Sequence, residues 1–147
     1  MQSFPQSHQA QKFIFHRQFI GFLMHKGKAQ LARAIFQTCL EKVGSITLVE
    51  RAIANVKPIF ETKRIRISGV TREIPCLVPL HRQEGLAIRW IIRAARERKK
   101  KNPRYSFAQA LASEILDASK AVGTARMQRD QLHKQAEQNR AFIHYFR

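Results

Sequence analysis

Apolar residues recur at spacings of three and four along most of the chain, a pattern typical of amphipathic helices that pack on one side. The clearest case is the apolar stripe formed by Leu31, Ala32, Ile35, Phe36, Cys39, Leu40 and Val43. Glycines, prolines and a potential capping box at Ser106 and Gln109 divide the pattern into segments. The sequence therefore predicts helices over about residues 17–26, 28–43, 47–56, 82–100, 106–122 and 124–142.

Between the third and fourth of these helices, apolar side chains recur at every second residue instead of every third or fourth. Residues 63–67 (KRIRI) alternate basic and apolar side chains, and Ser68 with Gly69 then provides a turn. Apolar residues alternate again on the return, at Ile74, Cys76 and Val78. This pattern predicts a β-hairpin, in which Pro75 restricts the second strand to an edge position because it lacks an N–H group. The expected fold class is mainly α, with about six helices and one hairpin.

The length of 147 residues fits one domain, and no glycine- or serine-rich linker divides the chain. We expect a single helical domain over residues 17–147, preceded by a flexible N-terminal tail at residues 1–16. The tail region contains no acidic residue. Its composition suits either the remnant of a transit peptide or a tail that threads into RNA, and does not distinguish the two.

The net charge of the chain indicates its class of partner, which its length does not. The chain has 27 Lys and Arg against 10 Asp and Glu, a formal net charge of +17. Such an excess is typical of proteins that bind a polyanion, and nucleic acid is the leading partner. A basic protein that only stays soluble, or that lies on an anionic membrane, is the alternative. No apolar run approaches the ~20 residues that a membrane-spanning helix needs, so no membrane insertion is expected.

The cations fall into three groups, which we take as the candidate nucleic-acid-binding residues. The hairpin group comprises Lys63, Arg64, Arg66 and Arg72. The second group lies on one face of the helix over residues 82–100, because its spacings are four, three and four; it comprises Arg89, Arg93, Arg96 and Lys100. Residues 96–104 (RERKKKNPR) are expected to continue from this helix as a basic loop. The last helix contributes Arg126, Arg129, His133, Lys134 and Arg140.

Sites for catalysis, metals or cofactors are not indicated. The segment from Gly21 to Gly27 has the wrong spacing for a phosphate-binding P-loop, and Ala29 stands where that motif needs Ser or Thr. The six histidines form no ligand array, and no nucleophile has an identifiable base. Cys39 and Cys76 form no C-x-x-C pair, and Cys39 lies in an apolar stripe, so we expect a packed thiol in a reducing compartment. The chain is therefore not expected to be an enzyme.

Four ordered segments resemble the universal family of small-subunit ribosomal protein seven. The most specific is LHKQAEQNRAFIHYF at residues 132–146, which is similar to the family's terminal signature and adds Asn139 to the candidate RNA-binding residues. The others are FLMHKGKAQLARAIF at 22–36, NVKPIFE at 55–61, and GVTREIPCLV with LAIRWIIRAAR at 69–78 and 86–96. The resemblance covers about residues 17–147.

This resemblance implies a helical bundle with a protruding β-hairpin arm at about residues 61–79. It further implies a primary rRNA-binding protein that helps to assemble the 3′ major domain, the head of the small subunit. The expected neighbours are other small-subunit ribosomal proteins, with the mRNA exit channel and the exit-site tRNA nearby.

The chain departs from the family pattern in its first ten residues, which contain no Lys or Arg, and at the hairpin tip, where Ser68 replaces a glycine. The divergent start favours an organellar member, mitochondrial rather than chloroplast. A basic DNA-binding protein of an organelle nucleoid is the alternative function. It would need a recognition helix with base-reading side chains at its start, whereas the helix that carries Arg89 begins with apolar and small residues.

Overall fold

The computed structural model describes residues 6–67 and 69–145, and within them the chain is mainly helical with one antiparallel hairpin. This confirms the predicted fold class. The elements in chain order are α1 (Gln6–Leu23), α2 (Ala29–Val43), α3 (Ile46–Val56), β1 (Phe60–Ile67), β2 (Val70–Leu77), α4 (Leu80–Lys101), α5 (Phe107–Ser119), α6 (Thr124–Gln138) and the 3₁₀ helix η1 (Arg140–Tyr145).

Helices α1 to α5 enclose the main hydrophobic core. We call these five helices the body. Phe19 of α1 stacks on Phe36 of α2 with ring centres 4.8 Å apart, and both side chains are buried. Ile91 of α4 and Ile115 of α5 are also fully buried within this core. The apolar stripes seen in the sequence are therefore the faces that pack together.

Helix ends follow the local signals in the sequence. Gly44 ends α2 in the left-handed conformation, with φ of +81°, and its N–H donates to the main-chain oxygen of Leu40. Ser45 then caps α3 by accepting a hydrogen bond from the Thr47 N–H. Ser106 and Gln109 form the predicted capping box at the start of α5. These caps satisfy main-chain groups that have no partner within the helix itself.

Three boundaries differ from the prediction. Helix α1 begins at Gln6 rather than near residue 17, because no glycine or proline interrupts the sequence between Gln6 and Gly21. Helix α4 continues to Lys101, so most of the run expected as a basic loop is helical, and the helix ends just before Pro103. Helix α6 ends at Gln138, and η1 follows it.

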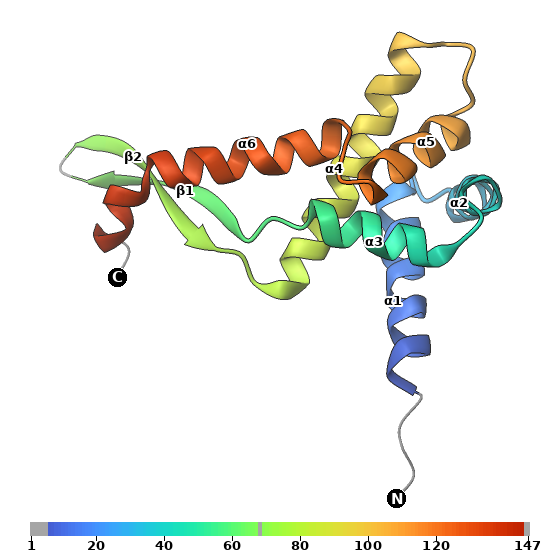
Figure 1. Cartoon of the computed structure of the whole chain (residues 1–147), viewed down its shortest axis with the longest axis horizontal. Coiled ribbons are helices and arrows are strands. Elements are labelled where there is room, and N and C mark those ends of the chain that lie inside the picture. The colour runs from blue at the N-terminus through green and yellow to red at the C-terminus, as the bar shows by residue number, and fades with distance from the viewer. Residues whose placement is uncertain (1–5, 68, 146–147) are drawn as a thin grey trace, which may run out of the picture.

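The hairpin and α6 extend together away from the body, as Figure 1 shows. Strand β1 pairs with β2 from Phe60 opposite Leu77 to Ile67 opposite Val70, and Gly69 has a φ of +84° in the turn. Ser68, the other residue of the expected turn, lies outside the described residues. Helix α6 lies along the hairpin and η1 contacts β2. We call the hairpin, α6 and η1 together the arm.

Candidate nucleic-acid interface

Helix α4 presents the predicted basic stripe to solvent. Arg89, Arg93, Arg96 and Lys100 are all exposed. The guanidinium carbon of Arg89 lies 4.7 Å from the centre of the Phe22 ring, so a cation–π contact holds this side chain against α1. Within the described part of the chain, no ion pair or hydrogen bond engages the other three side chains. With a rise of 1.5 Å per residue, the stripe extends over about 16 Å, which suits several successive phosphates.

The far end of this stripe borders a shallow hollow that the sequence did not indicate. Its lining comprises Arg96, Lys99, Lys100, Pro103 and Phe107. The sequence predicts a loop at Lys99, but α4 extends to Lys101, and this places Lys99 on the helix beside the stripe. The signal available in the sequence was the run of Lys and Arg, which are good helix formers. Cations around an aromatic ring offer both phosphate contacts and a surface for a base.

The four hairpin cations do not share one face. Residues directly opposite each other in an antiparallel pair point to the same side, so the register places Lys63 and Arg72 on one face and Arg64 and Arg66 on the other. Arg64 Nε lies 3.0 Å from a carboxylate oxygen of Glu73, and Arg72 stacks 4.7 Å over the Phe142 ring. Arg66 is exposed. The hairpin therefore carries basic residues on both faces.

Two arginines of α6 are engaged inside the protein. Arg126 Nη1 and Arg129 Nη1 both donate to the main-chain oxygen of Asn55, at 2.6 and 3.0 Å. Their Nε atoms donate to the two carboxylate oxygens of Asp130. Burial acts to raise the pKa of Asp130, but the hydrogen bonds and charges of Arg126 and Arg129 outweigh it, so this pKa lies below its ordinary value. Asp130 lies within one helical turn of both arginines, whereas their other partner, Asn55, is too far away in the chain for sequence spacing to reveal it.

The other candidates at the end of the arm differ in exposure. Lys134 and Arg140 are exposed, whereas Asn139 is half-buried and donates its side-chain amide to the main-chain oxygen of Gln135. Asn139 is also the C-cap residue of α6. Lys134 and Arg140 are thus accessible to a ligand, while Asn139 has a local role at the helix end.

His133 joins α6 to the base of the hairpin. Its Nε2 accepts a hydrogen bond of 3.1 Å from the Ile59 N–H, and its ring packs edge-on against Phe60 with centres 6.0 Å apart. Burial and then the charge of Arg129 lower the pKa of His133, although Asp130 acts in the opposite direction. The imidazole is therefore kept neutral, and its accepting nitrogen faces the protein rather than a phosphate.

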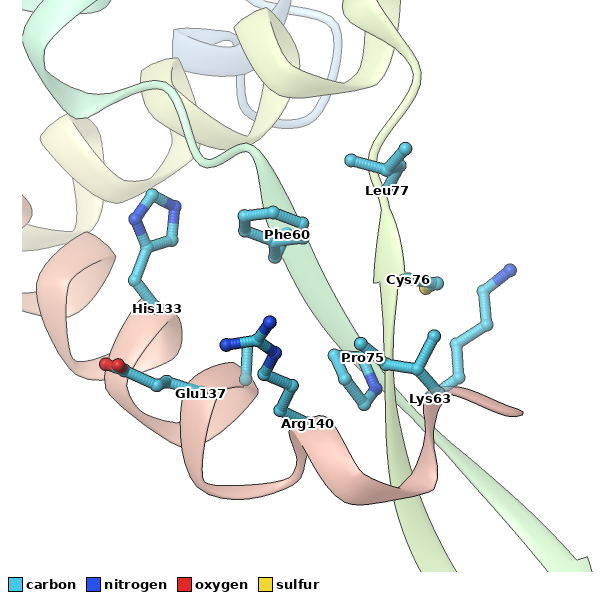
Figure 2. A pocket seen from close by; sticks show the side chains of 10 residues that line it. Phe60, Lys63, Pro75, Cys76, Leu77, His133, Glu137 and Arg140 are labelled. Atoms are coloured by element: carbon cyan, nitrogen blue, oxygen red, sulfur yellow. The ribbon is translucent and has the colours of Figure 1, made fainter. Parts of the chain in front are cut away.

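A groove of about 730 Å³ lies between the hairpin on one side and α6 with η1 on the other (Figure 2). Phe60, Pro75, Leu77 and Ile143 supply apolar surface, and Leu77 is 72 % exposed. Polar side chains also line it, namely Lys63, His133, Glu137 and Arg140. This mixture differs from the α4 stripe, which is basic along its whole length, and it suits contact with a protein segment better than with a phosphate backbone.

An ion pair between a buried glutamate and a partly exposed arginine, which the sequence did not predict, supports the start of α6. Glu114 of α5 is fully buried, and its Oε1 accepts a hydrogen bond of 3.2 Å from the Ala125 N–H in the first turn of α6. Its Oε2 lies 3.0 Å from Arg98 Nη2, close enough for an ion pair although the N–H direction does not meet hydrogen-bond geometry. Arg98 also pairs with Asp117. Arg98 thus pairs with carboxylates of the protein itself, whereas Arg96 and Lys99 on the same helix are exposed.

The thiols and potential metal ligands show no reactive arrangement within the described residues. Cys39 is fully buried, and burial raises its pKa to about 12, which confirms a packed thiol. Cys76 is buried and its Sγ lies 3.5 Å from the Glu61 main-chain oxygen. No cluster of three or more His, Cys, Asp or Glu side chains capable of holding a metal occurs among the described residues. None of the helices described is long and apolar enough to cross a membrane.

Comparison with known proteins gives consistent matches. The chain is 43% identical over 133 residues to the small ribosomal subunit protein uS7m of Marchantia polymorpha, covering 88% of this chain and 58% of that protein. It is 36% identical to the small ribosomal subunit protein uS7 of Hydrogenobaculum sp., covering 90% of this chain and 86% of the relative. The uS7 protein of Thermomicrobium roseum is 39% identical, with 88% and 84% covered.

The chain thus spans less than two thirds of the Marchantia relative and most of the two bacterial ones. A family profile described as ribosomal protein S7p/S5e matches residues 2–140, which include the α4 stripe, the hairpin and all of α6. The chain belongs to the ribosomal protein S7p/S5e family.

Proposed function

We propose that this protein is a structural constituent of the small ribosomal subunit that binds small-subunit rRNA and has no catalytic role. The main support for the proposal is the exposed stripe on α4, where one helix face carries Arg89, Arg93, Arg96 and Lys100. Four like charges on one face repel each other, and this repulsion is relieved when phosphates lie opposite. The names of the relatives, small ribosomal subunit protein, support rRNA as the source of those phosphates.

In this account, the basic side chains hold RNA by its backbone. Arginine forks and lysine ammonium groups contact phosphates without reading bases, and structured RNA is recognised largely through its shape. The α4 stripe contacts one RNA segment and the exposed cations of the arm contact another. The protein thereby helps to assemble and hold the 3′ major domain of the subunit head, near the mRNA exit channel and the exit-site tRNA.

Neighbouring small-subunit proteins are the second class of partner. The groove between α6 and the hairpin supports this part of the proposal, because it is largely apolar and lies on a strongly basic protein. Leu77 and Ile143 line it and expose 72 and 48 % of their surface. Exposed apolar patches commonly mark contacts with other proteins, whereas RNA-binding surfaces are more polar.

The proposed location is the mitochondrion, in the small subunit of its ribosome. The uS7m relative from Marchantia polymorpha supports an organellar assignment. A chloroplast ribosome is the alternative, and fractionation of the two organelles separates the two locations.

Quantitative binding measurements test the function. Filter binding should compare a transcript of the 3′ major domain of mitochondrial small-subunit rRNA with duplex DNA at equal salt. If the protein bridges about eight phosphates, log Kobs should fall with log salt at a slope of about −6 to −7. We expect tighter binding to the rRNA. A slope near zero contradicts the proposal, and equal or tighter binding to DNA favours the nucleoid alternative.

A further inference from the structure

Asn55 is the point at which three helices meet. It lies in the last turn of α3, and its main-chain oxygen accepts hydrogen bonds from Arg126 and Arg129 of α6. Its side-chain amide donates to the main-chain oxygens of Ala118 and Ser119, both at 3.0 Å, at the end of α5. Its side-chain amide thus satisfies two carbonyl groups at the end of α5, while its own carbonyl group, at the end of α3, anchors the start of α6.

This joint lies where α6 leaves the body. Helix α6 begins beside α3, α4 and α5 and runs from there to the hairpin (Figure 1). Its 15 residues give a length of about 22 Å at 1.5 Å per residue. A tilt of about 10° at the joint therefore displaces the far end by about 4 Å over such a length. A displacement of that size is larger than a hydrogen-bond length, so it is enough to break a direct contact with a phosphate oxygen.

The two arginines are poorly placed to bind phosphate themselves. Their side chains are only 24 and 20 % exposed, and Asp130 accepts hydrogen bonds from both. Arg129 directs three of its nitrogens to protein oxygens: Nε and Nη2 to Asp130, and Nη1 to Asn55. A nearby carboxylate also repels an approaching phosphate. The geometry therefore assigns these donors to the interior.

We infer that Asn55, Arg126 and Arg129 are positioning residues, which fix the angle of the arm so that the arm and the α4 stripe can contact one RNA at the same time. This inference rests on the proposed function for its consequence, but the fixed angle belongs to the free protein. Two surfaces held at the correct spacing bind far more tightly than either alone, because the second contact becomes intramolecular. Loss of the joint therefore weakens binding without removing a phosphate contact.

Distance measurements in the free protein test this inference. Nitroxide labels are attached to cysteines introduced at the exposed positions Lys99 on α4 and Thr71 on the hairpin, in a C39A/C76S background. Double electron–electron resonance then reports the distribution of distances between the body and the arm. The test variants are N55A, R126Q/R129Q and R126K/R129K. The lysine pair retains both positive charges but loses the forked donors that bridge Asn55 and Asp130.

We expect one narrow distribution in the parent and at least a twofold broader one in each joint variant, with circular dichroism and thermal melting used to select variants that remain folded. The matched control is K134Q/R140Q, which removes two exposed charges from the arm and leaves the joint intact. It should keep the narrow distribution although it lowers RNA affinity. Unchanged distributions in the folded joint variants overturn the inference.

Binding to the rRNA head transcript provides the second readout. The lysine pair should bind at least tenfold more weakly than the parent, because charge alone does not restore the angle of the arm. If R126K/R129K binds as tightly as the parent and keeps a narrow distance distribution, the arginines act only as charges. That result contradicts the inference. If the parent itself fails to bind rRNA, the proposed function fails, whereas the distance result still decides whether the joint fixes the arm.

Discussion

Arg126 Nη1 donates a hydrogen bond of 2.6 Å to the main-chain oxygen of Asn55, which lies 71 residues earlier in the chain. This contact links the first turn of α6 to the last turn of α3. It shows that a basic residue on this protein can serve the fold rather than the RNA. The cations therefore divide into an exposed set, led by the α4 stripe, and an internal set that includes Arg98, Arg126 and Arg129.

The exposed stripe should govern the electrostatic part of RNA binding. Replacing Arg93 and Arg96 with Gln removes two phosphate contacts, so the log–log salt slope should become shallower by about 1.4 to 1.8. Filter binding with the rRNA head transcript measures this change. A matched control, R33Q/R51Q, removes two exposed charges from α2 and α3. If the control reduces the slope as much as the stripe variant does, the stripe is not the principal contact.

Glu114 should stabilise the fold more through its hydrogen bond to the Ala125 N–H than through its charge. Substitution with Ala leaves the Ala125 N–H and Arg98 without a buried partner, and we expect a loss of about 3 kcal/mol in the free energy of unfolding. Gln retains an oxygen for the Ala125 N–H, and Arg98 keeps Asp117, so E114Q should lose only about 1 kcal/mol. Urea denaturation measures both values. Equal losses for the two variants would contradict this role for the hydrogen bond to α6.

Gly123 is required by the backbone where α6 begins. Its φ of +98° and ψ of 171° lie in a region that L side chains rarely adopt, and an added Cβ would lie 3.1 Å from Asp117 Cβ and from Glu114 Oε1. We expect G123A to destabilise the protein by about 2 kcal/mol. The control is G21A, since Gly21 lies within α1 and an added Cβ there meets nothing within 4 Å. G21A should be neutral or stabilising in the same denaturation assay.

His133 should make stability depend on pH. Its pKa is lowered in the folded protein, so the unfolded chain binds more protons near and below the ordinary value of 6.5. The free energy of unfolding should therefore fall as the pH decreases from 7.5 to 5.5, because protonation removes the acceptor for the Ile59 N–H. Denaturation at several pH values compares the parent with H133Q, which does not titrate. An equally steep fall in H133Q would assign the effect to another group.

The features of the fold that depend on local determinants could be predicted from the sequence. The spacing of Arg89, Arg93, Arg96 and Lys100 is a property of one helix, so their common exposed face could be predicted without tertiary information. The caps at Gly44 and Ser106 likewise depend on immediate neighbours. The hairpin was also recognised, because alternation and a glycine turn are short-range signals.

The partners that other cations have within the protein could not be predicted from the sequence, because they lie on distant segments of the chain. Arg129 and His133 each bond to a residue 74 positions away, and Arg98 pairs with a glutamate on another helix. On a helical wheel, these side chains look like the exposed cations beside them. Only the packing of α6 against α3 and the hairpin distinguishes a phosphate contact from a structural one.

Sedimentation is the most direct test of the central claim, that this protein is a constituent of the mitochondrial small ribosomal subunit. The tagged full-length protein should be followed through a high-salt sucrose gradient of lysate from purified mitochondria. We predict that it migrates with small-subunit rRNA and that the R93Q/R96Q variant is released at lower salt than the parent. Recovery of the parent as free protein at the top of the gradient, with intact small subunits below, would contradict the claim.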